Sequence, residues 1–236
     1  MKKNQKLKIG IIGSSGKMGK KIISACSRNS EFKNFKVTCL VNKKNINSDF
    51  IDVIPRASRP DVFIDFSLPN ATLASINIIK KYKTPLLICT TGFNQKQLNN
   101  ISKKLAKNLK WAMVSNTSLG IFLFKKIIET ISPYASFFNP QIKEWHHIHK
   151  KDKPSGTAKT LAETFELNSN KKIATESFRK GEIFGKHTFI LDSKREKISI
   201  NHTAKDRAIF AEGSLRLAKK LLNKKTKRQY SLDDLF

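Results

Sequence analysis

The feature that most constrains the fold is a short apolar run followed by three evenly spaced glycines. Leu7–Ile12 has the length and composition of a buried strand, and Gly13, Gly16 and Gly19 follow it as the chain enters a helical run. A strand, a glycine-rich turn and a helix open dinucleotide-binding α/β domains, because such a turn lets backbone N–H groups approach a pyrophosphate. Ser15 stands where the second glycine of the usual G-x-G-x-x-G pattern lies, so a plain tight turn remains the alternative interpretation.

As far as residue 117, apolar strand-like runs alternate with more polar helical runs. This alternation predicts an α/β domain with a Rossmann-like parallel sheet covered by helices. The loops that leave the carboxyl ends of such strands hold ligands, which makes the loops after residues 88 and 114 candidate cofactor loops. Further strands are predicted at 35–41, 60–66, 85–88 and 111–114, and helices at about 70–82 and 94–108. Ser67 or Asn70 is expected to cap the first of these helices.

The end of the second strand bears on the choice of cofactor. An NAD-specific fold places Asp or Glu there, where the carboxylate binds the ribose 2′-OH. This chain has Asn42, Lys43 and Lys44 instead. A neutral residue followed by two cations suits a 2′-phosphate, so we expect NADPH, NADH or both to be used. A lysine-rich loop without a cofactor role remains an equal alternative.

The pattern changes from Leu119 onward. A long apolar helix interrupted near Pro133 is followed by a strand at 141–147, a helix from Thr157, and alternating strands at 187–192 and 197–202. Consecutive alternating strands are typical of antiparallel pairing with one buried face. We therefore predict a second, smaller α+β domain with a mixed or antiparallel sheet.

Residues 144–157 hold the densest group of chemically active side chains. His146 and Lys150 are four residues apart, a spacing that puts both on one face of a helix or a strand. Pro154 must interrupt this segment, and Ser155-Gly156-Thr157 opens the next helix without an acidic residue in its first turn. Free N–H groups at such a turn bind anions. The pattern indicates a proton donor, a cation and an anion cradle, although a solvated basic loop is the alternative.

The same segment, Glu-x-His-His-x-x-Lys-x-Asp-x-Pro-Ser-Gly-Thr, resembles the signature of the 4-hydroxy-tetrahydrodipicolinate reductase (dihydrodipicolinate reductase) family of bacterial lysine biosynthesis. The Gly-x-x-Gly-x-Met-Gly turn is also similar to that family. Two departures are evident. Cys89 stands where the family has the first glycine of Gly-Thr-Thr-Gly, and the 45–60 connector is shorter than usual.

The resemblance implies an oxidoreductase that reduces 4-hydroxy-tetrahydrodipicolinate to tetrahydrodipicolinate with NADPH or NADH. It implies His146 as general acid and Lys150 as its supporting cation, with His147, Lys150, Ser155, Gly156 and Thr157 holding a substrate carboxylate. The implied cofactor-binding residues are Gly13, Ser14, Ser15, Gly16, Lys17, Met18, Asn42, Lys43, Cys89, Thr90, Thr91, Val114, Ser115, Asn116 and Thr117.

The resemblance also implies how the chain is divided. Residues 1–117 and 206–236 would form the dinucleotide-binding domain, because the C-terminal helix returns to it, and residues 118–205 would form the substrate-binding and oligomerisation domain. A homotetramer is expected, no metal ion is implied, and His187 and His202 are expected to have structural roles.

Charge and cysteine content test other classes of function. The formal charge of +28 would suit a nucleic-acid binder, but the lysines are scattered through every helix, so we expect neither nucleic acid nor membrane as a partner. Cys26, Cys39 and Cys89 lack metal or redox spacing, and the N-terminus lacks the apolar segment of a signal peptide. We expect a cytoplasmic enzyme. A related dehydrogenase that acts on an amino acid is the remaining enzymatic alternative.

Overall fold

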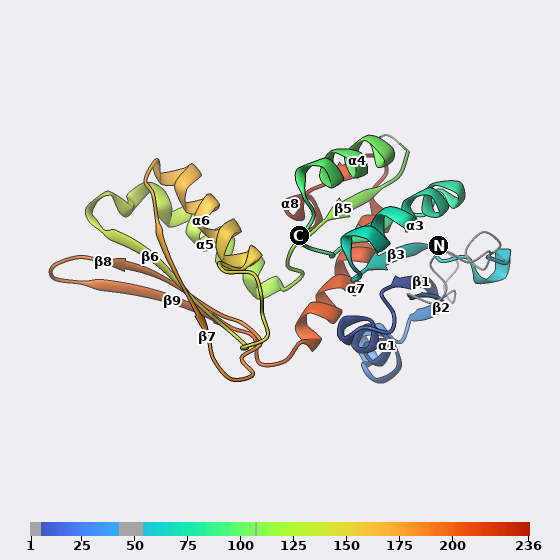
Figure 1. Ribbon diagram of the computed structural model, residues 1–236, viewed down its shortest axis with the longest axis horizontal. Helices are drawn as coiled ribbons and strands as arrows, with labels where there is room; N and C mark the ends of the chain where they lie inside the picture. Colours follow the sequence, from blue (N-terminus) through green and yellow to red (C-terminus); the bar gives the residue numbers. More distant parts are fainter. Residues whose placement is uncertain (1–5, 43–53, 107) are drawn as a thin grey trace. The chain divides into compact units, whose positions relative to one another are not determined.

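The computed structural model describes residues 6–42, 54–106 and 108–236 of the chain. The chain divides into two compact units (Figure 1). Unit 1 consists of Met1–Thr117 together with Ala208–Phe236, and unit 2 of Ser118–Arg207. The chain therefore leaves unit 1 and later returns to it.

Unit 1 contains a six-stranded sheet in which every neighbouring pair is parallel. Its strand order is β10-β5-β4-β3-β1-β2. The strands are β1 (Leu7–Ile12), β2 (Phe35–Val41), β3 (Val62–Asp65), β4 (Leu86–Ile88), β5 (Trp111–Met113) and β10 (Gln229–Tyr230). The chain order reverses between β1 and β3, which confirms the predicted Rossmann-like arrangement.

Apolar side chains on alternate strand positions form the two faces of this sheet. Ile9 and Ile11 belong to the cluster that includes α1 (Lys17–Arg28) and α7 (Ala208–Asn223), whereas Ile12 belongs to the cluster that includes α3 (Pro69–Tyr82) and α4 (Gln95–Leu105). Both faces are buried, as a parallel sheet requires. The helices are α1 (Lys17–Arg28), α3 (Pro69–Tyr82), α4 (Gln95–Leu105), α7 (Ala208–Asn223) and α8 (Leu232–Leu235), with short 3₁₀ turns η1 (Ser30–Phe32) and η2 (Arg56–Ser58).

The start of α3 differs from the sequence prediction. Leu68 is the N-cap residue, no side chain caps the helix, and Pro69 occupies its first position. Proline suits that position because its missing N–H would be unpaired there anyway. The predicted caps Ser67 and Asn70 were wrong, because the hydroxyl of Ser67 donates to the buried carboxylate of Asp65 instead.

Unit 2 packs two helices against a mixed four-stranded sheet of order β7-β6-β8-β9 (Figure 1). The strands β6 and β7 are parallel, and the other two pairs are antiparallel. Sequence reasoning did not identify β7. The elements are α5 (Leu119–Ile131), η3 (Ser132–Phe137), β6 (Asn139–His146), α6 (Gly156–Ser169), β7 (Ala174–Arg179), β8 (Lys186–Asp192) and β9 (Lys197–Thr203).

The period of two along β6 decides which of its side chains are buried under the helices of unit 2. Ile142 lies in the apolar cluster formed with α5 and α6, and Glu144 and His146 alternate with the less buried Lys143 and Trp145. Glu144 and His146 therefore point to the same face of the sheet as Ile142. Two polar side chains thus lie next to the core of unit 2.

Candidate active site

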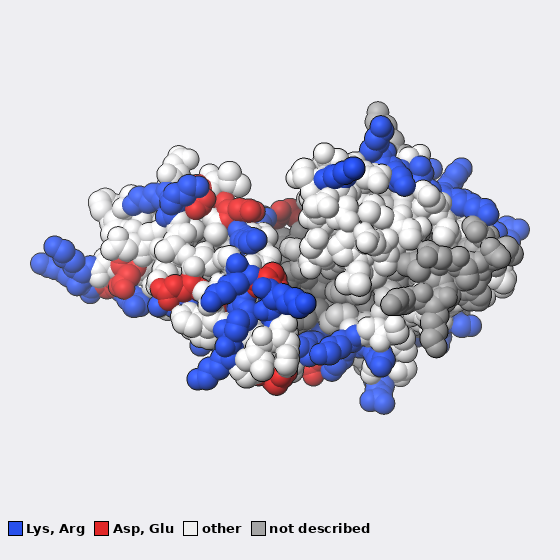
Figure 2. All heavy atoms as spheres, in the orientation of Figure 1, with Lys and Arg blue, Asp and Glu red and all other residues white. Residues whose placement is uncertain are grey.

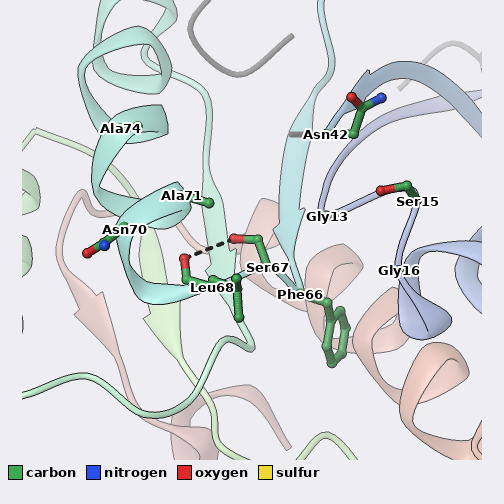
Figure 3. Close-up of a pocket in the computed structure, with 10 residues that line it drawn as sticks. All are labelled: Gly13, Ser15, Gly16, Asn42, Phe66, Ser67, Leu68, Asn70, Ala71 and Ala74. Atoms are coloured by element: carbon green, nitrogen blue, oxygen red, sulfur yellow. Dashed lines mark hydrogen bonds between the residues drawn. The ribbon is translucent and has the colours of Figure 1, made fainter. Parts of the chain in front are cut away.

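Unit 1 contains a cavity of about 530 Å³ at the carboxyl ends of its central strands. Figure 3 shows the turn after β1 facing the loop after β3 across this cavity. Its volume lies in the range typical of small-molecule and cofactor sites. The lining residues are Gly13, Ser15, Gly16, Asn42, Phe66, Ser67, Leu68, Asn70, Ala71 and Ala74.

The glycines of the first turn are required by close approach of backbone. Gly13 has φ +83°, and a Cβ on it would lie 2.5 Å from the carbonyl oxygen of Phe66. A Cβ on Gly19 would lie 2.5 Å from the carbonyl oxygen of Gly13. The turn therefore packs directly on its own helix and on the loop after β3.

The N-terminus of α1 has the character of an anion site. Gly16 is the N-cap residue, no side chain caps the helix, and the first turn contains no acidic residue. Backbone N–H groups and the helix dipole at such an end favour a phosphate. The cavity, the glycine cradle and this helix end fit a dinucleotide.

Asp65, at the end of β3, joins two loops beside this cavity. Its buried carboxylate accepts hydrogen bonds from the hydroxyls of Ser67, Thr72 and Thr90 and from the Ser67 N–H. Burial raises the pKa of Asp65, although these hydrogen bonds oppose the shift. Ser67 lines the cavity and Thr90 follows β4, so this one carboxylate links the two loops by hydrogen bonds.

The predicted cofactor residues fall into different environments. Gly13, Ser15, Gly16 and Asn42 line the cavity, whereas Lys43 lies outside the described residues. Sequence reasoning missed the segment from Phe66 to Ala74. Its position after the third strand, at the same sheet edge as the glycine turn, was the signal that could have identified it.

Several other predicted cofactor residues have structural contacts. The Ser14 hydroxyl donates to the carbonyl of Val41, and the Thr117 hydroxyl donates to the carbonyl of Phe210 at 2.6 Å.

The apolar cluster around α1 and α7 includes three more of the predicted cofactor residues, namely Met18, Cys89 and Val114. Burial raises the pKa of the Cys89 thiol well above its ordinary value, and the charge of Asp65 acts in the same direction. Lys17, Thr91 and Ser115 are exposed, and Asn116 is half-buried.

In unit 2, β6 places His146 beside a buried carboxylate. Glu144 is fully buried, His146 is 7% exposed, and Nδ1 of His146 lies 2.6 Å from Oε2 of Glu144. Burial opposes ionisation of Glu144, but contacts with His146, Ser155 and Ser177 lower its pKa below the ordinary range. Gly185 makes room for the imidazole, because a Cβ there would lie 3.3 Å from Nε2 of His146.

Two further histidines follow in sequence across the sheet, His187 next to His146 and His202 next to His187. His187 pairs with Glu144 across β6 and β8, and His202 pairs with His187 across β8 and β9. The His146 and His187 rings meet edge to face with centroids 5.2 Å apart. Burial, followed by the charge of His146, lowers the pKa of His187 to about 3. A neutral imidazole therefore adjoins His146.

Lys150 does not share a regular element with His146. The strand β6 ends at His146, and residues 147–149 form a turn closed by a hydrogen bond from the Lys150 N–H to the His147 carbonyl. The prediction that both lie on one face of a helix or strand was therefore wrong. Lys150 nevertheless acts electrostatically on His187, so its charge reaches the histidine group. Burial, followed by the charge of Arg207, lowers the pKa of His147.

The N-terminus of α6 is the predicted anion cradle, but it already has internal partners. Ser155 is the N-cap residue, and its hydroxyl accepts from the Ala158 N–H. Its own N–H donates to Glu144 at 3.1 Å. The backbone N–H of Gly156 helps to lower the pKa of the Asp152 carboxylate. The expectation that nothing internal occupies this helix end was wrong.

Asp152 also contacts Lys150, with Oδ1 2.7 Å from the ammonium nitrogen. Burial raises the pKa of Asp152, but the hydrogen bond from Lys150 outweighs it, and the net shift is downward. One internal carboxylate thus contacts both the cation and the helix end that the sequence assigned to a ligand. A ligand carboxylate would have the same two partners.

Sequence reasoning gave no role to Arg179, at the end of β7. Its guanidinium donates to Oε1 of Glu144 at 3.0 Å and to the carbonyls of Lys150 and Asp152. The side chain of Arg179 is 14% exposed. It therefore connects the Glu144 carboxylate to the backbone of the turn that carries Lys150.

Positive charge is widespread on the molecule. Figure 2 shows Lys and Arg side chains on both units, with far fewer Asp and Glu side chains on the face drawn. This distribution attracts anions of any kind. Among the described residues, no helix combines the length and apolar character needed to span a bilayer.

Comparison with known proteins gives a consistent result for both units. The family models "Dihydrodipicolinate reductase, N-terminus" and "Dihydrodipicolinate reductase, C-terminus" match residues 7–117 and 120–236. The 4-hydroxy-tetrahydrodipicolinate reductase of Pelagibacter ubique is 36% identical over 98% of both chains. That of Bdellovibrio bacteriovorus is 34% identical over 98% of this chain and 97% of its own.

A solved structure has the same fold. It is a dihydrodipicolinate reductase from Paenisporosarcina sp. TG-14 with dipicolinate bound, and it superposes with a TM-score of 0.74 at 20% identity. The match covers 98% of this chain and 99% of that one. At this identity the likeness concerns the fold of the chain.

Proposed function

The chain belongs to the dihydrodipicolinate reductase family and is an NAD(P)H-dependent 4-hydroxy-tetrahydrodipicolinate reductase of the diaminopimelate route of lysine biosynthesis, and we propose that His146 and Lys150 supply the proton of this reaction. The observation that carries the proposal is the buried Glu144–His146 contact at 2.6 Å beside a cationic turn and a helix N-terminus. Proton donor, cation and anion-binding amides occur together within unit 2.

The chemistry of the substrate explains why a donor is needed. The substrate is a cyclic imine dicarboxylate whose 4-hydroxyl leaves as water, which gives a C=C bond conjugated with the imine. The bound nicotinamide cofactor would supply a hydride to the ring carbon that lost the hydroxyl. Negative charge then moves toward the ring nitrogen, where a positioned acid accelerates the reaction. With Nδ1 2.6 Å from the Glu144 carboxylate, the Nε2–H of a protonated His146 is the one that can donate that proton. Lys150 adds a counter-charge beside it.

The start of α6 is proposed to hold one carboxylate of the substrate. The Gly156 N–H, the hydroxyls of Ser155 and Thr157, and the ammonium of Lys150 supply charge-assisted hydrogen bonds, with His147 at the edge of the group. The substrate carboxylate would replace Asp152 on Gly156 and Lys150. The dipicolinate bound by the Paenisporosarcina enzyme is a dicarboxylate of the same kind.

The cofactor is proposed to lie in the cavity of unit 1. Gly13, Ser15 and Gly16 would hold the pyrophosphate at the start of α1, and Asn42 would face the adenosine ribose. Asn42 carries no negative charge to repel a 2′-phosphate. We therefore propose that NADPH is used at least as well as NADH.

Two broader properties are also proposed. The resemblance to the family supports a homotetramer in which unit 2 contributes the interfaces, and light scattering of the eluted protein would give its mass directly. The biosynthetic role supports a cytoplasmic location, which fractionation of the source cells would test.

The test of the function is cofactor oxidation by the purified protein. Substrate generated in place from pyruvate and aspartate semialdehyde should cause a fall in NADPH absorbance at 340 nm that depends on both the enzyme and the substrate. Oxidation of an amino acid with NADP⁺, in the absence of that activity, would instead identify an amino-acid dehydrogenase.

A further inference from the structure

The carboxylate of Glu144 has contacts on three sides in the interior of unit 2. Its Oε1 accepts from the Ser155 N–H at 3.1 Å and from Arg179 at 3.0 Å, while Oε2 lies 2.6 Å from Nδ1 of His146. Glu144 is fully buried. Because a buried carboxylate is costly without partners, these contacts fix its position closely. One group thus contacts the proton donor and the first residue of the anion cradle.

Arg179 extends this connection to the turn that carries Lys150. In addition to Glu144, its guanidinium donates to the carbonyl of Lys150 at 3.2 Å, to that of Phe178 at 2.7 Å and to that of Asp152. A planar guanidinium holds several acceptors in fixed directions, which a lysine ammonium would not reproduce. The backbone on both sides of Lys151 is therefore held by a residue of β7.

From these contacts we propose that Glu144 is a positioning residue that holds His146 in the Nδ1–H tautomer and, with Arg179, fixes Lys150 and the start of α6 relative to it. This inference rests on the proposed roles of His146 and Lys150. Glu144 itself touches neither substrate nor cofactor in this scheme. With Nδ1–H held toward Glu144, the Nε2–H of the protonated imidazole is the proton that can be donated, and the Nδ1–H tautomer remains after the transfer.

A metal site is the competing interpretation of the same cluster. Glu144, His146 and His187 bring possible ligand atoms within 4.8 Å of one another. Two ligands of one tetrahedral zinc ion lie roughly 3.3 Å apart, given metal–ligand distances of about 2.0–2.1 Å. The 2.6 Å separation of Oε2 and Nδ1 is shorter than that and is the distance of a close ion pair, and Arg179 already neutralises the carboxylate. The geometry therefore favours a proton between the two groups.

The kinetic test is a double-mutant cycle. Glu144→Gln keeps the size of the side chain and removes its charge, and it should lower kcat by about 10–100-fold, as loss of an orienting partner of a histidine typically does. In a His146→Ala background the same change should lower kcat by less than about twofold, because its target is gone. Effects that multiply in the double variant would overturn the proposal.

Controls separate positioning from general damage to the sheet. Glu176→Gln removes a carboxylate from β7 that pairs with Lys143 and is 44% exposed, and it should leave kcat and the melting temperature unchanged. Wild-type and variant proteins should retain their activity in EDTA. Loss of wild-type activity in EDTA, with recovery on adding Zn²⁺, would replace the proposal by a metal site.

A second variant covers the case in which Glu144→Gln does not fold. Arg179→Lys keeps the charge beside Glu144 but loses the fork that holds the Lys150 and Asp152 carbonyls. We expect the KM for the dicarboxylate substrate to rise by about tenfold and kcat to fall less. An unchanged KM would contradict the role given to Arg179.

A readout without turnover distinguishes failure of this inference from failure of the proposed function. In ¹⁵N spectra of histidine-labelled protein, His146 should carry its proton on Nδ1 in the wild type and lose that preference in Glu144→Gln. If the wild type lacks reductase activity but this signature holds, the function is wrong and the positioning contact stands. A wild-type His146 protonated only on Nε2 would refute the contact.

Discussion

The carboxylate of Asp152 contacts the groups that we assign to the substrate, and removing its charge should strengthen substrate binding. It lies 2.7 Å from the Lys150 ammonium, and the Gly156 N–H helps to lower its pKa. Asp152→Asn keeps the size of the side chain but withdraws the competing anion. The dissociation constant of dipicolinate, and the KM of the substrate, should therefore fall.

The expected change is modest, because solvent screens the interaction that is lost. The side chain of Asp152 is 53% exposed and that of Lys150 is 24% exposed. Ion pairs with this exposure contribute about 0–1 kcal/mol. Since 1.4 kcal/mol corresponds to a factor of ten, affinity should increase by up to about fivefold.

Calorimetric titration of dipicolinate into the wild type and the variant measures this directly. Asp192→Asn is a matched control, because Asp192 is 48% exposed and pairs with Lys197. It lies at the end of β8 away from His187. It should not alter the affinity. Tenfold weaker binding in Asp152→Asn would refute the reasoning and show that Asp152 holds Lys150 in its working position.

Four other substitutions test the remaining assignments. His146→Ala should lower kcat by roughly 10²–10⁴ while the dissociation constant of NADPH, followed by fluorescence, hardly changes. Thr157→Val should raise the substrate KM about tenfold, and because Ser155 rather than Thr157 caps α6, its melting temperature should stay near that of the wild type. Asn42→Asp should shift kcat/KM from NADPH toward NADH, which initial rates with each cofactor would measure. The pKa of His187 is about 3 in the folded chain, against an ordinary value of 6.5. As the pH falls below about 6.5, the unfolded chain takes up a proton that the folded chain does not. This residue therefore makes the free energy of unfolding decrease as the pH falls, by at most ~1.4 kcal/mol per pH unit. Urea titrations between pH 6.5 and 4.5 should show a smaller fall in His187→Gln.

Much of the fold follows from local pattern. The glycine turn, the buried strands and the alternation of strand and helix in unit 1 predicted its sheet, because each strand has both faces apolar and each turn has its own glycine or polar signal. By contrast, β10 is two residues long and pairs with β5 only because the C-terminal segment returns to the sheet. No local pattern specifies that pairing. The strand β7 is partly exposed and lacks clear alternation, so it too escaped prediction.

The site was predictable in its residues but less so in its contacts. The signature identified His146, Lys150 and the Ser155 turn, and the period of two along a strand could have added Glu144 as a neighbour of His146. Arg179 is far from these residues in sequence and joins them through pairing of β6 with β7. Occupation of the α6 amides by Glu144 and Asp152 depends on tertiary placement, which first-turn composition does not reveal.

The return of the chain to unit 1 has a consequence for synthesis on the ribosome. The helix α7, which packs against α1, and the strand β10, which completes the sheet, follow unit 2 in the sequence. The nascent chain must therefore complete unit 2 while the apolar face that α7 will cover is still open. Unit 2 is continuous in sequence and could acquire its native contacts first. A growing chain of this protein thus depends on delayed closure of its N-terminal half, the interval in which chaperones would be expected to bind it.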